Sequence, residues 1–184
     1  MTSIDVASAG AYPQKGEFRQ CQYTGLKVDI AAQTLIKANA VAAVLFLAFG
    51  GTLGLLVALT RWPAVHLLSS EAFYLVLTAH GTDVLVFWIV FFEVAVLYFA
   101  SAVLLNCRLA APKLGWVAFV LMVVGAIVAN IAIFQGESSV MFTSYPPLMA
   151  KPHFYLGLIV FAVGALLATG LFFTLRTRLV QVRR

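Results

Sequence analysis

The residues of this sequence best placed to do chemistry are a histidine and two carboxylates in one hydrophobic segment. His80 lies in the stretch Leu77–Gly81, Asp83 follows about one helical turn later, and a second carboxylate, Glu93, lies further along. A titratable side chain within lipid is costly and is usually retained because it binds a ligand or moves a proton. One imidazole can supply one axial ligand to a haem iron. The sequence therefore predicts that His80 binds haem iron.

The helical neighbours of His80 favour a flat ligand. Apolar and aromatic side chains such as Phe87 share its face of the helix, and Gly81 leaves space beside it for a bulky planar group. Asp83 lies on roughly this face, whereas Glu93 lies deeper and near the far side of the helix. For each carboxylate two interpretations stay open: contact with protons or water, and pairing with a polar side chain of another helix.

The elements that must position these residues are long apolar helices. Hydrophobic residues make up 62% of the 184 residues and charged residues only 10%, a composition that a water-soluble domain could not bury. Stretches long enough to cross a bilayer occur at Ala40–Thr60, Tyr74–Leu105, Leu114–Phe134 and Phe154–Leu175. The predicted fold is therefore all-α, a polytopic membrane protein with four transmembrane helices.

The charge distribution predicts the orientation of these helices. Of the 12 lysines and arginines that give the net charge of +5, only Arg61 and Lys151 fall on one side of the predicted topology, and the other ten fall on the opposite side. Basic residues are enriched in cytoplasmic segments, so both termini are predicted to be cytoplasmic. The excess positive charge then reflects topology, and no nucleic-acid partner is expected.

The chain divides at the start of the first span. Residues 1–38 are predicted to form a loose cytoplasmic arm and a short interfacial helix over Val28–Ala38, and residues 39–184 the transmembrane part. Cys21 and Cys107 both fall on the predicted cytoplasmic side, where a disulfide is not expected. They are interpreted as structural thiols.

Three local signals indicate how the helices begin and pack. Gly50 and Gly54 have the GxxxG spacing that lets a second helix approach closely in lipid. Ser69 can cap the second helix, and Asn130 can join two helices by a hydrogen bond. These signals predict a packed bundle without saying which helix contacts which.

The outer loop before the fourth span is the second informative stretch. Tyr145 precedes Pro146 and Pro147, which hold it extended and make the loop stiff. Two interpretations stay open: docking against another surface, and an ordinary interfacial aromatic followed by a helix breaker.

The remaining histidines lie at the membrane boundary. His66 is interpreted as a solvated loop residue and His153 as a structural residue. No second histidine lies at the depth of His80, and no three-histidine copper site can be assembled, so this chain alone is not expected to reduce dioxygen.

Three stretches together resemble subunit I of haem–copper terminal oxidases, specifically the B-type (ba-type) cytochrome c oxidases. They are Leu77–Gly81 (LTAHG), Met141–Leu148 (MFTSYPPL) and Phe154–Gly157 (FYLG). Their order, spacing and predicted sidedness match the family, and the resemblance extends from about Leu35 to Leu175. The family's subunit I has about twelve spans, so the resemblance covers its N-terminal third, and the chain is either a fragment or one part of a split subunit.

The resemblance implies a role for each part. His80 would be one axial ligand of low-spin haem b, with the second ligand outside this chain. The rest of subunit I would supply the second haem, the copper and the oxygen-reducing, proton-translocating site. The Tyr145-Pro146-Pro147 loop would lie near the copper-bearing subunit II, which receives electrons from cytochrome c. The complex would lie in a bacterial or archaeal cytoplasmic membrane.

Two alternatives follow from the residues without the resemblance. One is a stand-alone four-helix b-type cytochrome in which two copies each contribute His80 to a shared haem. The other is a haem-free small transporter or accessory protein that uses Asp83 and Glu93. The presence of haem and the sequence downstream of the chain distinguish these alternatives from an oxidase subunit.

Overall fold

Four long helices dominate the protein. The computed structural model describes residues 18–20, 22–23, 25, 27–105, 109, 111–141, 144–145 and 148–182. In chain order the elements are β1 (Phe18–Gln20), β2 (Lys27–Asp29), α1 (Ile30–Arg61), α2 (Ser70–Thr82), η2 (Asp83–Phe87), α3 (Trp88–Phe99), η3 (Ala100–Leu104), α4 (Pro112–Ala132), η4 (Ile133–Glu137) and α5 (Pro152–Val182).

The predicted all-α, four-span architecture is confirmed. In the part of the chain that the structure describes, four helical segments are long and apolar enough to cross a membrane: Ile30–Arg61, Ser70–Leu104, Pro112–Glu137 and Pro152–Phe172. Their side chains supply the hydrocarbon surface, and their backbones satisfy their own hydrogen bonds, as a lipid environment requires. The chain is therefore an integral membrane protein.

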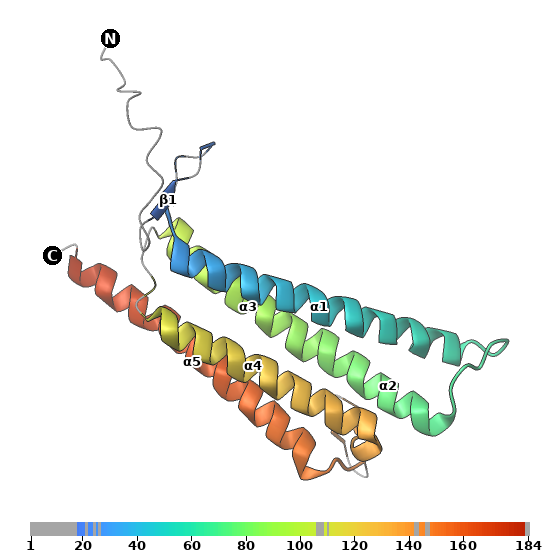
Figure 1. Ribbon diagram of the computed structural model, residues 1–184. Helices are drawn as coiled ribbons and strands as arrows, with labels where there is room; N and C mark the ends of the chain where they lie inside the picture. Colours follow the sequence, from blue (N-terminus) through green and yellow to red (C-terminus); the bar gives the residue numbers. More distant parts are fainter. Residues whose placement is uncertain are drawn as a thin grey trace.

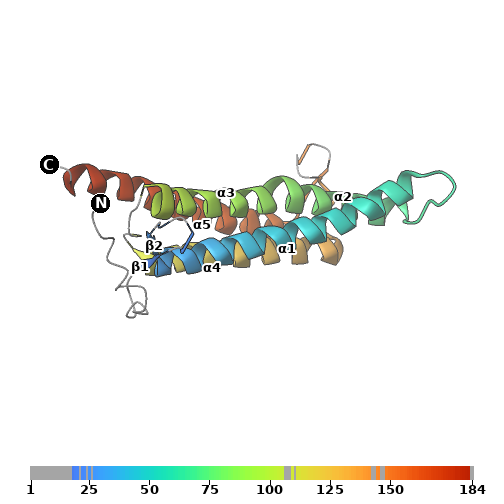
Figure 2. The same cartoon turned by 90° about the horizontal axis from the view of Figure 1, so that it is seen from above.

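The helices lie side by side in an elongated bundle. α1 packs along α2 and α3, and α4 packs along α5 (Figure 1). In the view from above, the pair formed by α1 and α3 lies over the pair formed by α4 and α5 (Figure 2). The two pairs contact each other through α1 and α4 and through α3 and α5. The β1 strand and the C-terminal end of α5 lie at one end of the bundle, and the connection between α1 and α2 lies at the other (Figure 1). The predicted cytoplasmic location of the termini stays a prediction.

The second span is one long helix with two π-helical turns. Ser69 caps its start by accepting a hydrogen bond from the backbone N of Ala72 over 3.4 Å, as predicted. The helix then passes through the π-turns η2 and η3, of which η2 begins at Asp83. Each π-turn widens the helix by one residue and rotates the following residues about its axis; such turns are frequent at functional sites. The first one directly follows the segment that carries His80.

The N-terminal part differs from the prediction. β1 and β2 pair as an antiparallel two-stranded sheet, so the described part of the predicted loose arm contains two strands. Residues 1–17 lie outside the described residues. The short helix predicted over Val28–Ala38 is not separate, because Val28 lies in β2 and α1 runs without interruption from Ile30 to Arg61. No glycine or proline stands between residues 30 and 49 to end a helix. The two helical patterns therefore merge into one.

One side chain ties this N-terminal part to the bundle. Asp29, at the end of β2, accepts a hydrogen bond from the backbone N of Leu109 over 3.3 Å. The contact joins the start of α1 to the segment between the second and third spans. Cys21 and Cys107 lie outside the described residues. The assignment of residues 1–38 to the cytoplasmic side also stays a prediction.

Aromatic rings join the two helix pairs. Phe46 of α1 stacks on Phe91 of α3 with ring centroids 5.5 Å apart. Phe87 of η2 and Phe161 of α5 lie with their centroids 4.7 Å apart, and Phe91 also meets Phe161 edge-on. These rings form a buried layer across the bundle that fixes η2, and with it the C-terminal side of the His80 segment.

Candidate functional site

The imidazole of His80 is fixed between two helices. His80 is half-buried on α2, and its Nδ1 lies 2.8 Å from the backbone carbonyl oxygen of Gly50 on α1. A carbonyl oxygen only accepts hydrogen bonds, so Nδ1 carries the proton in this contact. In the neutral ring, Nε2 then keeps its lone pair. This is the tautomer that a metal-ligating histidine adopts when its other nitrogen is held by a backbone carbonyl.

The second glycine of the GxxxG pair provides the space for this ring. A Cβ atom on Gly54 would lie 2.7 Å from His80 Cε1 and 2.9 Å from Nδ1. The imidazole therefore lies directly against the backbone of α1, at a position from which a Cβ atom would displace it. The sequence indicated only that Gly50 and Gly54 admit a helix. Their role in holding His80 was missed, because every residue has a backbone carbonyl and residue type therefore does not indicate which one accepts a hydrogen bond.

This geometry fits an axial haem ligand. When Nδ1 of an imidazole donates to a backbone carbonyl, Nε2 is the nitrogen that can ligate a haem iron. Within the described residues, no group of three or more histidine, cysteine, aspartate or glutamate side chains could hold a metal ion. The location of a second axial ligand stays a prediction.

Asp83 is paired with the asparagine that the sequence singled out. Asp83 is fully buried in η2, and Asn130 Nδ2 of α4 donates to its Oδ1 over 2.8 Å. The same amide nitrogen donates to the backbone oxygen of Ala126 over 3.1 Å. The predicted interhelical role of Asn130 and the pairing interpretation of Asp83 are thereby confirmed. Glu93 is exposed on α3, so these two carboxylates do not share a site.

The outer loop is attached to the His80 helix. The hydroxyl of Thr78 accepts a hydrogen bond from the backbone N of Met141 over 2.8 Å and donates to the carbonyl oxygen of Tyr74 over 2.7 Å. Met141 has a positive φ of 54°, so the loop backbone turns sharply at this anchor. Sequence reasoning did not find this contact, which lies two residues before His80.

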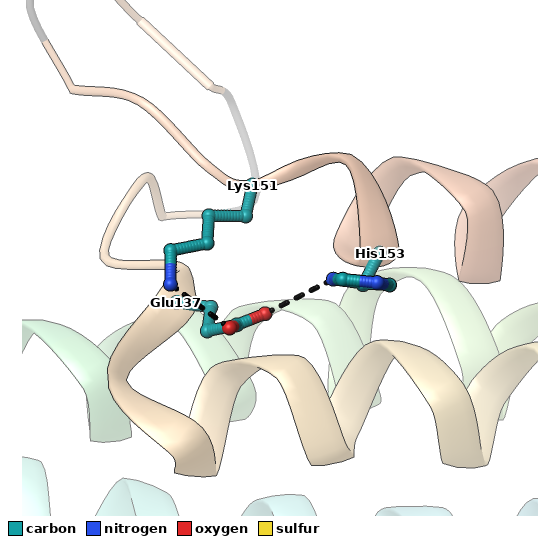
Figure 3. Close-up of polar contacts among 3 residues, drawn as sticks. All are labelled: Glu137, Lys151 and His153. Atoms are coloured by element: carbon teal, nitrogen blue, oxygen red, sulfur yellow. Dashed lines mark hydrogen bonds and ion pairs between the residues drawn. The ribbon is translucent and has the colours of Figure 1, made fainter.

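A second set of contacts closes the base of the same loop. Glu137 accepts a hydrogen bond from Lys151 Nζ at 3.0 Å, and its other carboxylate oxygen lies 3.3 Å from His153 Nδ1 (Figure 3). The backbone N of Lys151 also donates to the oxygen of Glu137, and Ser138 pairs with Ala150 as an isolated bridge. His153 therefore has a structural role here, as predicted, and exposed His66 lies in the loop between α1 and α2.

The loop presents part of its predicted docking surface. The side chain of Tyr145 is 66% exposed and that of Met149 is 84% exposed. Pro146 and Pro147 lie outside the described residues. An anchored loop with large exposed side chains is compatible with docking, but its occupant stays a prediction.

Two grooves lie between α1 and α4, away from His80. The first has a volume of about 420 Å³ and is lined by Phe46, Phe49, Ile127, Asn130, Ile131, Phe134 and Gln135. The second, of about 630 Å³, continues from it along α1 towards Lys37. Both are almost entirely apolar, as expected of a surface that contacts lipid or another apolar helix. Neither includes His80 among its lining residues, so the candidate haem ligand lies outside them.

The family of the chain follows from its similarity to known proteins. Residues 34–183 match the family described as Cytochrome C and Quinol oxidase polypeptide I. The chain is 31% identical over 96 residues to Cytochrome c oxidase subunit 1 of Thermus thermophilus. It also superposes with a TM-score of 0.69 and 30% identity on a chain from a cryo-EM structure of a heme-copper terminal oxidase dimer. The chain belongs to this family and resembles the N-terminal part of a haem–copper oxidase subunit I.

The chain is much shorter than these relatives. The match covers 51% of this chain and 16% of the Thermus protein, and 76% of this chain and 24% of the oxidase chain. Assignment to the B-type branch stays a prediction.

Proposed function

We propose that this chain holds low-spin haem b in a cytochrome c oxidase, with His80 Nε2 as one axial ligand. The observation that carries the proposal is the 2.8 Å contact between His80 Nδ1 and Gly50 O in a member of the oxidase subunit I family. The contact sets the tautomer, and a bound haem takes up and releases single electrons. The second axial ligand, the oxygen-reducing haem–copper site and proton translocation belong to the rest of subunit I.

In this proposal the residues around His80 orient the ligand. The Gly50 carbonyl holds the imidazole plane and increases the basicity of Nε2 by accepting from Nδ1. Gly54 allows the ring to lie against α1, so the ring cannot rotate freely. The aromatic layer formed by Phe87 and Phe91 with α5 supports the helix below the site. A ligand held in one orientation loses little entropy when it binds iron.

Electrons would enter from the outer side. The copper-bearing subunit II would dock near Tyr145, Pro146 and Pro147 and pass electrons from cytochrome c to the haem at His80. The hydrogen bond between Thr78 and Met141 supports this route, because it fixes the loop to the helix that carries the ligand. The proposed location is a bacterial or archaeal cytoplasmic membrane, with both termini and residues 1–38 on the cytoplasmic side. The B-type branch is part of the same proposal.

The proposal is tested by purifying the tagged chain from its native membrane in mild detergent with whatever copurifies. We expect the remaining part of subunit I and a copper-bearing subunit to copurify, a reduced b-type absorption band, and oxygen uptake with reduced cytochrome c. His80→Ala should abolish the band, whereas His66→Ala, which changes the exposed loop histidine, should leave it intact.

The same preparation distinguishes the alternatives. A b-type band in a preparation that contains this chain alone would indicate the shared-haem cytochrome. Complete absence of haem from the wild-type complex would overturn the proposal and favour a transporter or accessory role for Asp83 and Glu93.

A further inference from the structure

Five buried side-chain oxygen atoms have no hydrogen-bond partner in the part of the chain that the structure describes. Two of them, Asp83 Oδ2 and Asn130 Oδ1, belong to side chains that are hydrogen-bonded to each other. The other polar atoms of the same two groups are already engaged, because Asn130 Nδ2 donates to Asp83 Oδ1 and to Ala126 O. Both amide protons are used in these contacts. The amide therefore has no donor left for Asp83 Oδ2.

The two atoms are enclosed by this chain itself. Asp83 has no exposed surface, and both orphan oxygens are buried. On the α1 side, a Cβ on Gly50 would lie 3.0 Å from Asp83 Cβ, so the backbone of α1 closes that side. Because both oxygens are buried within this chain, a small donor fits them better than a large side chain.

The surroundings are suited to a water molecule. Buried acceptors in native proteins almost always have a donor, and ordered water commonly provides it. One water molecule has two O–H groups and can donate one to Asp83 Oδ2 and one to Asn130 Oδ1. Asn130 also lines the groove of about 420 Å³ between α1 and α4, together with the polar side chain of Gln135. These two amides are the polar side chains of an otherwise apolar groove.

We propose that Asp83 and Asn130 bind one water molecule, which donates one O–H to Asp83 Oδ2 and the other to Asn130 Oδ1. The site lies among α1, η2 and α4, one helical turn beyond His80, and goes beyond the haem proposal. The water hydrates a carboxyl group within the membrane and joins it to the groove wall at Asn130. Asp83, Asn130 and the water thus form a polar connection between the groove and the His80 helix.

The test is a cryo-EM map of the complete complex at a resolution that shows ordered water, for wild type and for Asp83→Asn. In wild type we expect one density peak at hydrogen-bond distance, about 2.7–3.2 Å, from both Asp83 Oδ2 and Asn130 Oδ1. In Asp83→Asn, the new amide N–H can donate directly to Asn130 Oδ1, so the peak should be lost. Thr169→Val on α5 is the control, because the Thr169 hydroxyl bonds only within its own helix to Ala165, and it should keep the peak.

The wild-type map alone can overturn the proposal. Direct hydrogen-bond contact between Asp83 Oδ2 and Asn130 Oδ1, without density between them, would show that a proton on the carboxyl group is the donor. A side chain from outside this chain donating to either atom would also exclude the water. These outcomes do not depend on haem content, so failure here is distinguishable from failure of the haem proposal.

Discussion

Among the glycines that bring helices close together in this molecule, Gly125 and Gly54 have different kinds of neighbour. Between α4 and α5 the neighbour is backbone, because a Cβ on Gly125 would lie 2.6 Å from the carbonyl oxygen of Gly157. Between α1 and α2 the neighbour of Gly54 is the imidazole of His80. The first contact packs two helices. The second makes a slot in which one side chain is oriented.

The difference shows that small residues in a membrane helix have two separable uses. In lipid the hydrophobic effect does not drive helices together, so the close backbone contact between α4 and α5 stabilises the bundle through van der Waals packing. In the slot between α1 and α2, a histidine side chain hydrogen-bonded to a backbone carbonyl takes the place of direct contact between the two backbones. The two interfaces should therefore respond differently to the same kind of substitution.

The largest effect is expected at the packing interface. Gly125→Val places methyl groups against the backbone of Phe161 and Gly157, where neither neighbour can move without shifting α5. Overpacking of this kind typically costs about 1–3 kcal/mol or more. The amount of folded chain in the membrane and its melting temperature should fall. Gly170→Val is the matched control, because Gly170 has nothing within 4 Å of its Cβ position; an equal loss in this control would contradict the account.

A smaller and more specific effect is expected in the slot. Gly54→Ala should push the His80 ring away from Gly50 and lower the haem content or shift the b-type band, with the bundle still folded. The added Cβ would lie 2.7 Å from Cε1. Gly51→Ala adds the same methyl group to the same helix, with nothing within 4 Å. The account fails if absorption spectra of these two variants change equally or not at all.

These expectations could be reached only partly from the sequence. The length of the hydrophobic stretches predicted the four spans, and a serine ahead of an apolar helix predicted the Ser69 cap, because both are local patterns. The Asn130 contact could be predicted because a single polar side chain in lipid needs a hydrogen-bond partner. The helix partners of Gly50 and Gly54 could not be predicted, since spacing does not encode which helix packs on which. The continuous α1 was missed because the interfacial and transmembrane patterns share one helical period.

The contact at Thr78 shows the same limit. A threonine in an apolar helix usually bonds to its own helix backbone, and only the fold reveals that the hydroxyl of Thr78 also accepts from Met141. The Asp83–Asn130 pair was foreseeable as two polar groups needing partners. The two oxygens of this pair that lack a hydrogen-bond partner could not be predicted, because their burial depends on how α1, η2 and α4 pack together.

The smallest predicted effect concerns the outer loop. Thr78→Val removes the acceptor of the Met141 N–H, and the loss of one hydrogen bond at a half-buried residue costs about 0.5–1.5 kcal/mol. The loop should be cleaved faster by protease, while haem content stays normal. Thr52→Val is the control, because the exposed Thr52 hydroxyl bonds only to Ala48 in its own helix. Loss of haem in Thr78→Val without faster cleavage would mean that Thr78 acts on His80 and not on the loop.

The central claim, that His80 is a haem ligand oriented by α1, is tested most directly by the reduced-minus-oxidised absorption spectrum of the complex carrying His80→Gly. We predict loss of the low-spin b-type band and its partial return when imidazole is added, since the slot beside Gly54 would be vacated. An unchanged band in His80→Gly without imidazole would contradict the claim.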